Sequence, residues 1–223
     1  MKCMFIEAKC NEKFELPSDV VDVLPKELTI ATSVQFIDSV PGIKKQLEDS
    51  GVKVSLVKGR HSKHNGQILG CDFVCDVKGT ESGNYLYIGD GLFHAKSILL
   101  KGAEKVFVFN PLNKQLTEIN DKDINKIKKK MMGALLKFKT STQIGVIITK
   151  KSGQQRLNDA LEFKKKYEEQ NKTIFLFLCN TLDFSELENF PFIDCWVNTM
   201  CPRIGYDDSL RTSKPILNID DVN

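Results

Sequence analysis

The predicted fold and site depend most on one stretch near the carboxyl end: Ile193-Asp194-Cys195-Trp196-Val197, followed by Asn198-Thr199-Met200-Cys201-Pro202-Arg203-Ile204. The first five residues are mostly apolar, β-branched or aromatic, which predicts a buried strand. Cys201 lies just past that strand. Pro202 biases it toward an extended backbone, and Arg203 places a cation nearby that favours the metal-binding thiolate. The alternative is a buried cysteine that acts as a small hydrophobic side chain.

A second cysteine has a comparable setting. Cys71 closes the loop Gly66-Gln67-Ile68-Leu69-Gly70-Cys71, downstream of a predicted strand at Val52–Val57. Its glycine neighbour lets the backbone approach a ligand closely. Thiolates are the ligands that iron–sulfur clusters and zinc prefer. Two sulfurs are too few for either, so a shared site would need a ligand from elsewhere.

Composition narrows the class of protein. The chain has 223 residues, of which 41% are hydrophobic and 27% charged, as in soluble globular proteins of one or two domains. The net charge of +3 gives little support for nucleic-acid binding. No apolar run is long enough to span a membrane, and a signal-peptide pattern is missing. Seven cysteines without framework spacing suit a reducing compartment. We therefore expect a cytoplasmic protein without membrane or direct nucleic-acid partners.

The order of predicted elements repeats between the two halves. Each half runs strand, polar turn, helix, strand, and then a late loop with the cysteine: Leu28–Thr32, Gly42–Ser50 and Val52–Val57, then Ile144–Thr149, Gln155–Gln170 and Thr173–Leu178. This pattern predicts an α/β fold of two related units, each a small parallel sheet flanked by helices. We place the units at residues 1–120, with Cys71, and 121–223, with Cys201. Ligands of such sheets bind beyond the carboxyl ends of the strands.

Other segments complete the expected fold. We predict strands at Met4–Ala8, Tyr85–Ile88 and Val106–Phe109, and helices at Phe93–Leu100 and Asp121–Phe138. The last helix carries Lys126, Lys128, Lys129 and Lys130, for which a solvated face is favoured over an RNA-binding patch.

Two polar turns are candidate ligand sites. Gly89-Asp90-Gly91-Leu92-Phe93-His94 is a glycine-rich turn that can present backbone N–H groups to an anion. Asp90 can accept from a ribose hydroxyl or an amino group, or it can simply cap the following helix. Thr149-Lys150-Lys151-Ser152-Gly153-Gln154 lacks the phosphate-binding loop pattern. It remains a candidate for holding a carboxylate or phosphate at a helix start.

A zinc site is a further alternative. His61 and His64 precede Cys71 and Cys75, but their order and spacing match no common structural zinc module. Histidines in a solvated polar loop are the favoured interpretation.

Taken together, these motifs resemble those of the archaeal diphthamide synthases. The matching stretches are Thr32-Ser33-Val34-Gln35, Gly66 to Cys71, Ile88 to His94, Lys151-Ser152-Gly153-Gln154 and Asn198 to Ile204. The resemblance implies the first step of diphthamide biosynthesis, in which a 3-amino-3-carboxypropyl group passes from S-adenosylmethionine to a histidine of elongation factor 2. It also implies a 4Fe–4S cluster held by three cysteines.

By this resemblance, Cys71 and Cys201 are cluster ligands. The candidate cofactor-binding residues are Gly89, Asp90, Gly91, His94, Ser152, Gly153, Gln154 and Arg203. No side chain is assigned as an acid, base or nucleophile, since the protein's part is to orient the cofactor and exclude water.

The chain departs from the family in one respect: it resembles only the second and third of three similar units, each of which supplies a cysteine. We therefore expect a partner chain to provide the third ligand. One alternative is a self-contained enzyme in which a local cysteine, first of all Cys75, substitutes. The other is a non-catalytic relative or zinc-binding protein that supports a partner enzyme. Cys179 and Cys195, on apolar strands, are expected in the core.

Overall fold

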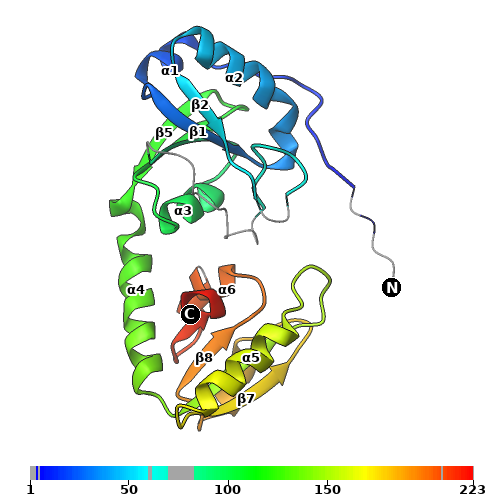
Figure 1. The fold of residues 1–223 in the computed structure, drawn as a ribbon, viewed down its shortest axis with the longest axis vertical. Helices are drawn as coiled ribbons and strands as arrows, with labels where there is room; N and C mark the ends of the chain where they lie inside the picture. The colour runs from blue at the N-terminus through cyan, green and yellow to red at the C-terminus, as the bar shows by residue number, and fades with distance from the viewer. Residues whose placement is uncertain (1–3, 5, 60–61, 70–82, 207, 223) are drawn as a thin grey trace. The chain divides into compact units, whose positions relative to one another are not determined.

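The computed structural model describes residues 4, 6–59, 62–69, 83–206 and 208–222 (Figure 1). The chain divides into two compact units, Met1–Asn125 and Lys126–Asn223. The expected boundary between residues 120 and 121 falls at the start of helix α4, Asp121–Thr140. The first turn of this helix belongs to the first unit, because Ile124 is fully buried in that unit's core.

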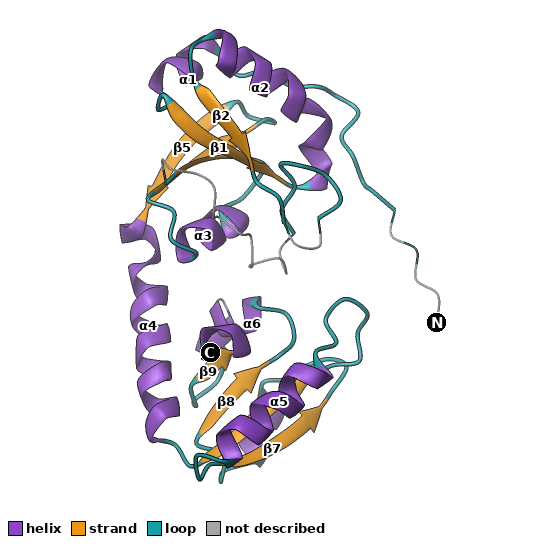
Figure 2. Ribbon diagram, in the orientation of Figure 1, coloured by secondary structure: helices purple, strands orange, loops and turns teal. Residues whose placement is uncertain are grey.

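The first unit is a five-stranded sheet with helices on both faces (Figure 2). Its elements are α1 (Ser18–Val23), β1 (Glu27–Thr32), η1 (Val34–Ser39), α2 (Val40–Asp49), β2 (Lys53–Leu56), β3 (Asn84–Ile88), α3 (Phe93–Leu100), β4 (Lys105–Asn110) and β5 (Gln115–Asn120). The strand order is β2-β1-β3-β4-β5. The first four strands are parallel, and β5 pairs antiparallel with β4.

The second unit is a four-stranded parallel sheet. After α4 come β6 (Gln143–Ile148), α5 (Leu157–Glu168), β7 (Thr173–Leu178), η2 (Ser185–Asn189), β8 (Cys195–Asn198), α6 (Arg203–Tyr206), η3 (Asp208–Arg211), β9 (Ile216–Asn218) and η4 (Ile219–Asp221). The order is β7-β6-β8-β9.

The two sheets share the order of four parallel strands, which confirms the predicted α/β fold of two related units, and the first sheet adds the antiparallel β5. The order β2-β1-β3-β4 in the first unit corresponds to β7-β6-β8-β9 in the second. In the sequence, however, the two cysteines do not follow corresponding strands. Cys71 follows β2 in the sequence, whereas Cys201 follows β8, the counterpart of β3. The turn after β3, which begins at Gly89, is therefore the counterpart of the Cys201 turn.

The strand predicted at Met4–Ala8 is wrong. Its described residues, 4 and 6–8, pair with no described strand, and Met4 and Ile6 are both 83% exposed. Residues further along instead reach elements of the first unit through polar groups. The N–H of Cys10 donates to the carbonyl of Gln35, and the N–H of Leu16 to Oε1 of Gln46. These contacts fix an extended segment without a sheet partner.

Each sheet has side chains packed on both faces, although the edge strand β7 exposes Leu176 and Leu178. In the first unit, α1 and α2 cover one face and α3 covers the other. In the second, α4 and α5 pack on one face through Phe138 and Phe163. The opposite face of that sheet is organised around Trp196, which is fully buried and makes edge-on ring contacts with Phe177 and Phe190. Because side chains pack on both faces of this sheet, its strands have apolar residues at successive positions.

Gly145 of β6 makes room for this tryptophan. A Cβ atom at position 145 would lie 2.4 Å from two ring carbons of Trp196. Real contacts of that length do not occur, so the ring or the strand would have to move. The packing of Trp196 in β8 therefore requires glycine at position 145 of the neighbouring strand β6.

Gly145→Ala should lower the free energy of unfolding by about 2 kcal/mol, because overpacking a close-packed core forces side chains and backbone to shift. Urea denaturation checks this. Gly133→Ala is the matched control: nothing lies within 4 Å of a Cβ at this exposed position of α4. It should leave stability unchanged or raise it by up to about 1 kcal/mol. Equal midpoints for Gly145→Ala and the unaltered chain would contradict this packing account.

Candidate functional site

The carboxyl ends of β6, β7 and β8 bring three chain segments to one edge of the second sheet. Ile148 pairs with Leu178 and Ile147 with Asn198. The chain continues past this edge at Thr149, Cys179 and Thr199. The N–H of Cys179 donates to the carbonyl of Ile148 (2.9 Å), and that of Thr199 to the carbonyl of Ile147 (3.0 Å). The parallel register therefore places these residues where ligands of such sheets bind.

Cys201 lies in the turn between β8 and α6 as a free, half-buried cysteine. Side-chain bonds hold this turn. Asn198, at the end of β8 and 1% exposed, accepts from the N–H of Met200 (3.0 Å) and donates to the carbonyl of Cys201 (3.0 Å). The turn thus has a fixed backbone, while the thiol remains partly accessible.

A second asparagine supports the first. Asn218, at the end of β9 and 3% exposed, accepts from Nδ2 of Asn198 (2.8 Å) and donates to the carbonyl of Pro202 (3.0 Å). Sequence reasoning missed Asn218. Its only signal is a polar residue that ends the apolar pair Ile216 and Leu217, both 2% exposed.

The other two described cysteines of this unit differ from each other. Cys195 is fully buried, as predicted, and burial raises the pKa of its thiol to about 12. Cys179 was expected in the core but lies one residue past β7, half-buried at the carboxyl edge. Its Sγ is 3.8 Å from Sδ of Met200. Burial raises its pKa, and Lys151 opposes this effect.

The turn after β6 is more exposed than the sequence suggested. Ser152 and Gly153 are exposed and Gln154 is half-buried. The turn does not form the helix start, because α5 begins at Leu157 with Arg156 as its N-cap residue. The guanidinium of Arg156 makes two bonds of 2.7 Å to the carboxylate of Asp220. This bidentate pair secures the chain immediately after the turn.

In the first unit, the turn from Gly89 to His94 connects β3 with α3. The side chain of Tyr87, in β3, contacts this turn: the Tyr87 hydroxyl lies at a hydrogen-bond distance of 3.0 Å from Nδ1 of His94. A Cβ at position 89 would lie 2.6 Å from that hydroxyl, so glycine is needed for the contact. Sequence reasoning missed this contact of Tyr87 with the candidate residue His94, because the apolar strand around Tyr87 predicts only a core role.

Asp90 does not cap the following helix. The N-cap residue of α3 is Leu92, without a side-chain cap bond, and Asp90 is exposed. Burial, together with the charge of Asp90, raises the pKa of Tyr87 well above its usual range. The phenol therefore stays neutral at physiological pH and hydrogen-bonds Nδ1 of His94 in that form.

Several predicted residues lie outside the described residues: Cys71, Cys75 and His61. His64 of the alternative zinc site is described, and its Nε2 is 2.9 Å from Oε1 of Glu7. The bonds from His64 and Lys63 lower the pKa of Glu7 to about 2. Within the described parts of the chain, no group of three or more His, Cys, Asp or Glu side chains is placed to hold a metal ion.

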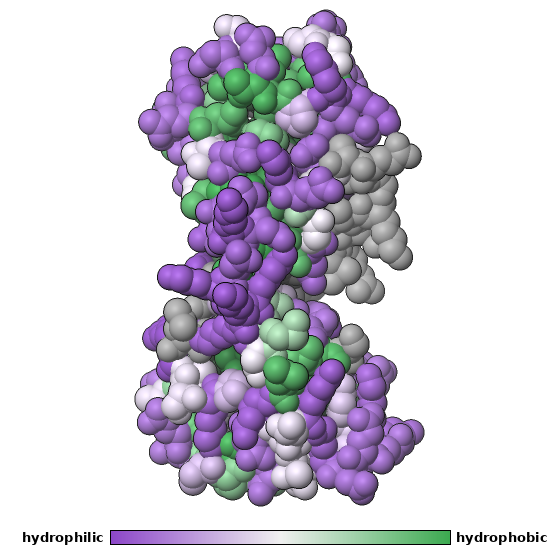
Figure 3. Space-filling view, turned by 90° about the vertical axis from the view of Figure 1, so that its left-hand side faces the viewer, coloured by the Kyte–Doolittle hydropathy of each residue, from purple (hydrophilic) through white to green (hydrophobic). Residues whose placement is uncertain are grey.

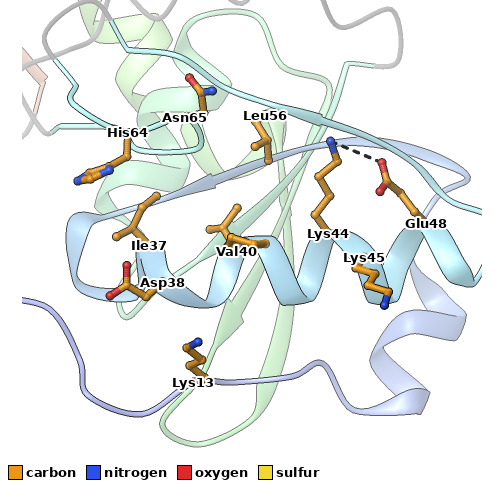
Figure 4. Close-up of a pocket in the computed structure, with 11 residues that line it drawn as sticks. Lys13, Ile37, Asp38, Val40, Lys44, Lys45, Glu48, Leu56, His64 and Asn65 are labelled. Atoms are coloured by element: carbon orange, nitrogen blue, oxygen red, sulfur yellow. Dashed lines mark ion pairs between the residues drawn. The ribbon is translucent and has the colours of Figure 1, made fainter.

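A pocket of about 610 Å³ in the first unit lies beside α2 (Figure 4). Its lining includes the apolar Ile37, Val40 and Leu56 and the lysines Lys13, Lys44 and Lys45. Lys44 pairs with Glu48 at 3.6 Å. The described residues that line this pocket include none of those predicted to bind a cofactor.

The lysine-rich helix α4 exposes most of its lysines to solvent. Lys126, Lys128 and Lys129 are exposed, and the surface seen from the side of this helix is largely hydrophilic (Figure 3). None of the helices in the described ranges is both long enough and apolar enough to cross a bilayer.

Comparisons with known proteins agree with the resemblance noted in the motifs. The model of the family described as "Putative diphthamide synthesis protein" matches residues 1–223. The 2-(3-amino-3-carboxypropyl)histidine synthase of Pyrococcus horikoshii is 30% identical over 201 residues, covering 89% of this chain and 57% of the relative. The synthase of Methanocaldococcus jannaschii is 32% identical, covering 86% of this chain and 49% of the relative.

Structural comparison gives the same result. A crystal structure of Dph2 from Pyrococcus horikoshii with a 4Fe–4S cluster matches with a TM-score of 0.77 and 27% identity. The match covers 92% of this chain and 58% of that protein. The chain thus spans between about half and three fifths of the relatives' length.

The four described cysteines should differ in reactivity. At about pH 8, Cys195 has a thiolate fraction on the order of 10⁻⁴, given its pKa of about 12 and full burial. Iodoacetamide should therefore modify the half-buried Cys10 and Cys201 long before Cys195, as read by peptide mass spectrometry. In urea all should react. Early labelling of Cys195 in the folded chain would contradict its assignment to the core.

Proposed function

The chain belongs to the diphthamide synthesis protein family, and from this premise we propose that it takes part in the first step of diphthamide biosynthesis. In this step a 3-amino-3-carboxypropyl group passes from S-adenosylmethionine to a histidine of elongation factor 2. The names of the archaeal relatives, 2-(3-amino-3-carboxypropyl)histidine synthase, support the proposal. We place the reaction in the cytoplasm, where thiols stay reduced.

The observation that carries the proposal is the setting of Cys201. This thiol is free and half-buried on a turn held by Asn198, at the carboxyl edge of the sheet. Its donor chemistry fits an iron–sulfur cluster, which thiolates hold. When bound, such a cluster supplies the electron for reductive cleavage of a carbon–sulfur bond of S-adenosylmethionine. We propose Cys71 and Cys201 as its ligands in this chain.

The polar turns supply the cofactor-binding groups of the proposal. Exposed Asp90, with Gly89 and Gly91 beside it, offers a carboxylate to the amino group or ribose of S-adenosylmethionine. Tyr87 holds the imidazole of His94 in place through its bond to Nδ1. In the second unit, Ser152 and Gly153 are exposed and Gln154 is half-buried, and these residues offer polar groups to the cofactor. Arg203 offers a cation suited to the cofactor's carboxylate.

The third cluster ligand comes, in this proposal, from a partner chain. The chain covers 57% of the Pyrococcus relative, which leaves room there for a further unit. A relative from Caenorhabditis elegans, 28% identical, is named subunit 1 of the synthase, which supports function within a complex. A cluster held by two protein thiolates has two irons open and should lose iron readily.

The test is anaerobic reconstitution, with iron and sulfide counted, of this chain alone and with candidate partner chains. Transfer of label from carboxyl-labelled S-adenosylmethionine to elongation factor 2 is then measured. We expect the chain alone to retain the cluster poorly and to show no transfer. With the partner, we expect it both to retain the cluster and to transfer the label. Efficient transfer by the isolated chain would overturn the need for a partner and make Cys75 the first replacement ligand to mutate. Absence of iron beside every partner would favour the non-catalytic or zinc-binding alternative.

Substitution of the proposed ligands should separate cluster binding from folding. Cys71→Ala and Cys201→Ala should each abolish stable iron binding, since each removes a thiolate, while leaving far-ultraviolet circular dichroism unchanged. Cys179→Ala is the matched control on the same edge as Cys201. It should keep the iron content and cost about 1 kcal/mol of stability, as a small truncation does. Full iron and cluster absorption in either ligand variant would remove that residue from the ligand set.

A further inference from the structure

The Cys201 turn is held by a closed set of side-chain amide bonds. Nδ2 of Asn198 donates both of its hydrogens, one to the carbonyl of Cys201 and one to Oδ1 of Asn218, and its Oδ1 accepts from the N–H of Met200. Nδ2 of Asn218 then donates to the carbonyl of Pro202. The two side chains thus bond three backbone groups of one short turn, whose two carbonyls also accept the N–H groups of Ile204 and Gly205.

These bonds permit only one orientation of the Asn198 amide. If its oxygen and nitrogen exchanged places, two donors would face each other at Met200, and two acceptors would face each other at Cys201. The amide orientation is therefore set by the network, and in turn it sets the positions of residues 200 to 202. A fully satisfied buried network specifies one geometry more strictly than apolar packing does.

Gly205 allows the second asparagine to reach the turn. A Cβ at position 205 would lie 2.5 to 2.6 Å from the side-chain amide of Asn218. Gly205 also donates its N–H to the carbonyl of Pro202 (3.2 Å), the acceptor that Asn218 uses. The small residue and the asparagine therefore act on the same carbonyl, next to Cys201 in the chain.

We propose that Asn198 and Asn218 are positioning residues that fix the Cys201 thiol for cluster binding, an inference that rests on the proposed function. Two buried amides at strand ends lose their hydration, and the hydrogen bonds that they make to each other and to the turn offset this cost. What they provide is order in the turn before the metal binds. A ligand ordered during folding loses less entropy on binding. Neither residue touches the cluster in this proposal.

The first test uses the chain without a cluster. Asn218→Ala should raise the amide hydrogen exchange of residues 200–205 and change the alkylation rate of Cys201 by about tenfold, since a buried hydrogen bond is lost from the turn. Cys10, in the other unit, is the internal reference and should react at its original rate. Ser141→Ala is the matched control: it removes a buried hydroxyl of the same unit, bonded to the carbonyl of Lys137 before β6.

The second test uses the reconstituted chain with its partner. Asn218→Ala should release iron to a chelator about tenfold faster than the unaltered protein and alter the electron paramagnetic resonance signal of the reduced cluster. Ser141→Ala should do neither, even if its thermal stability falls equally. Identical Cys201 alkylation or identical iron release in the two variants would overturn the proposal. Should Asn218→Ala fail to fold, Asn218→Ser keeps a small polar group in the same space and is held to the same outcomes.

The two proposals fail in distinguishable ways. If the unaltered chain binds no iron with any partner, the proposed function fails and the cluster-positioning role fails with it. If the unaltered chain binds iron but Asn218→Ala retains it equally well, only the positioning role is wrong.

Discussion

The parallel register of β6 and β8 is the constraint on which the second unit depends. It brings Asn198 to the carboxyl edge beside Ile147, and from there one buried amide holds the backbone of the Cys201 turn. The register in turn needs Trp196 seated against Gly145, since any larger side chain would displace the ring. Packing inside the sheet and the geometry of the thiol at its edge are therefore two consequences of one strand alignment.

The α/β architecture of two related units could be predicted because it depends on local patterns in the sequence. Apolar runs alternate with amphipathic helices in the same order twice, and this order specifies parallel sheets. The full burial of Cys195 likewise follows from the strand around it. The order of the motifs in the sequence also indicates the family. These features depend on neighbours in the sequence, which a single chain displays directly.

Features that depend on distant residues escaped prediction. Asn218 completes the Cys201 turn from a three-residue strand that carries no periodic signal. The apolar strand around Tyr87 predicts a core residue, and the hydrogen bond of its hydroxyl with His94 is evident only in the structure. The segment from Met4 to Ala8 has the composition of a strand but finds no described partner. The different strands that precede Cys71 and Cys201 become clear only when the two sheets are compared.

The central proposal is that Cys71 and Cys201 are ligands of the same iron–sulfur cluster. The most direct measurement is a crystal structure of the reconstituted protein with its partner, with diffraction recorded at the iron absorption edge. The account predicts anomalous density bonded to Sγ of both Cys71 and Cys201, with the third thiolate from the partner. Iron bonded to only one of these cysteines, or to histidines of the first unit, would contradict it.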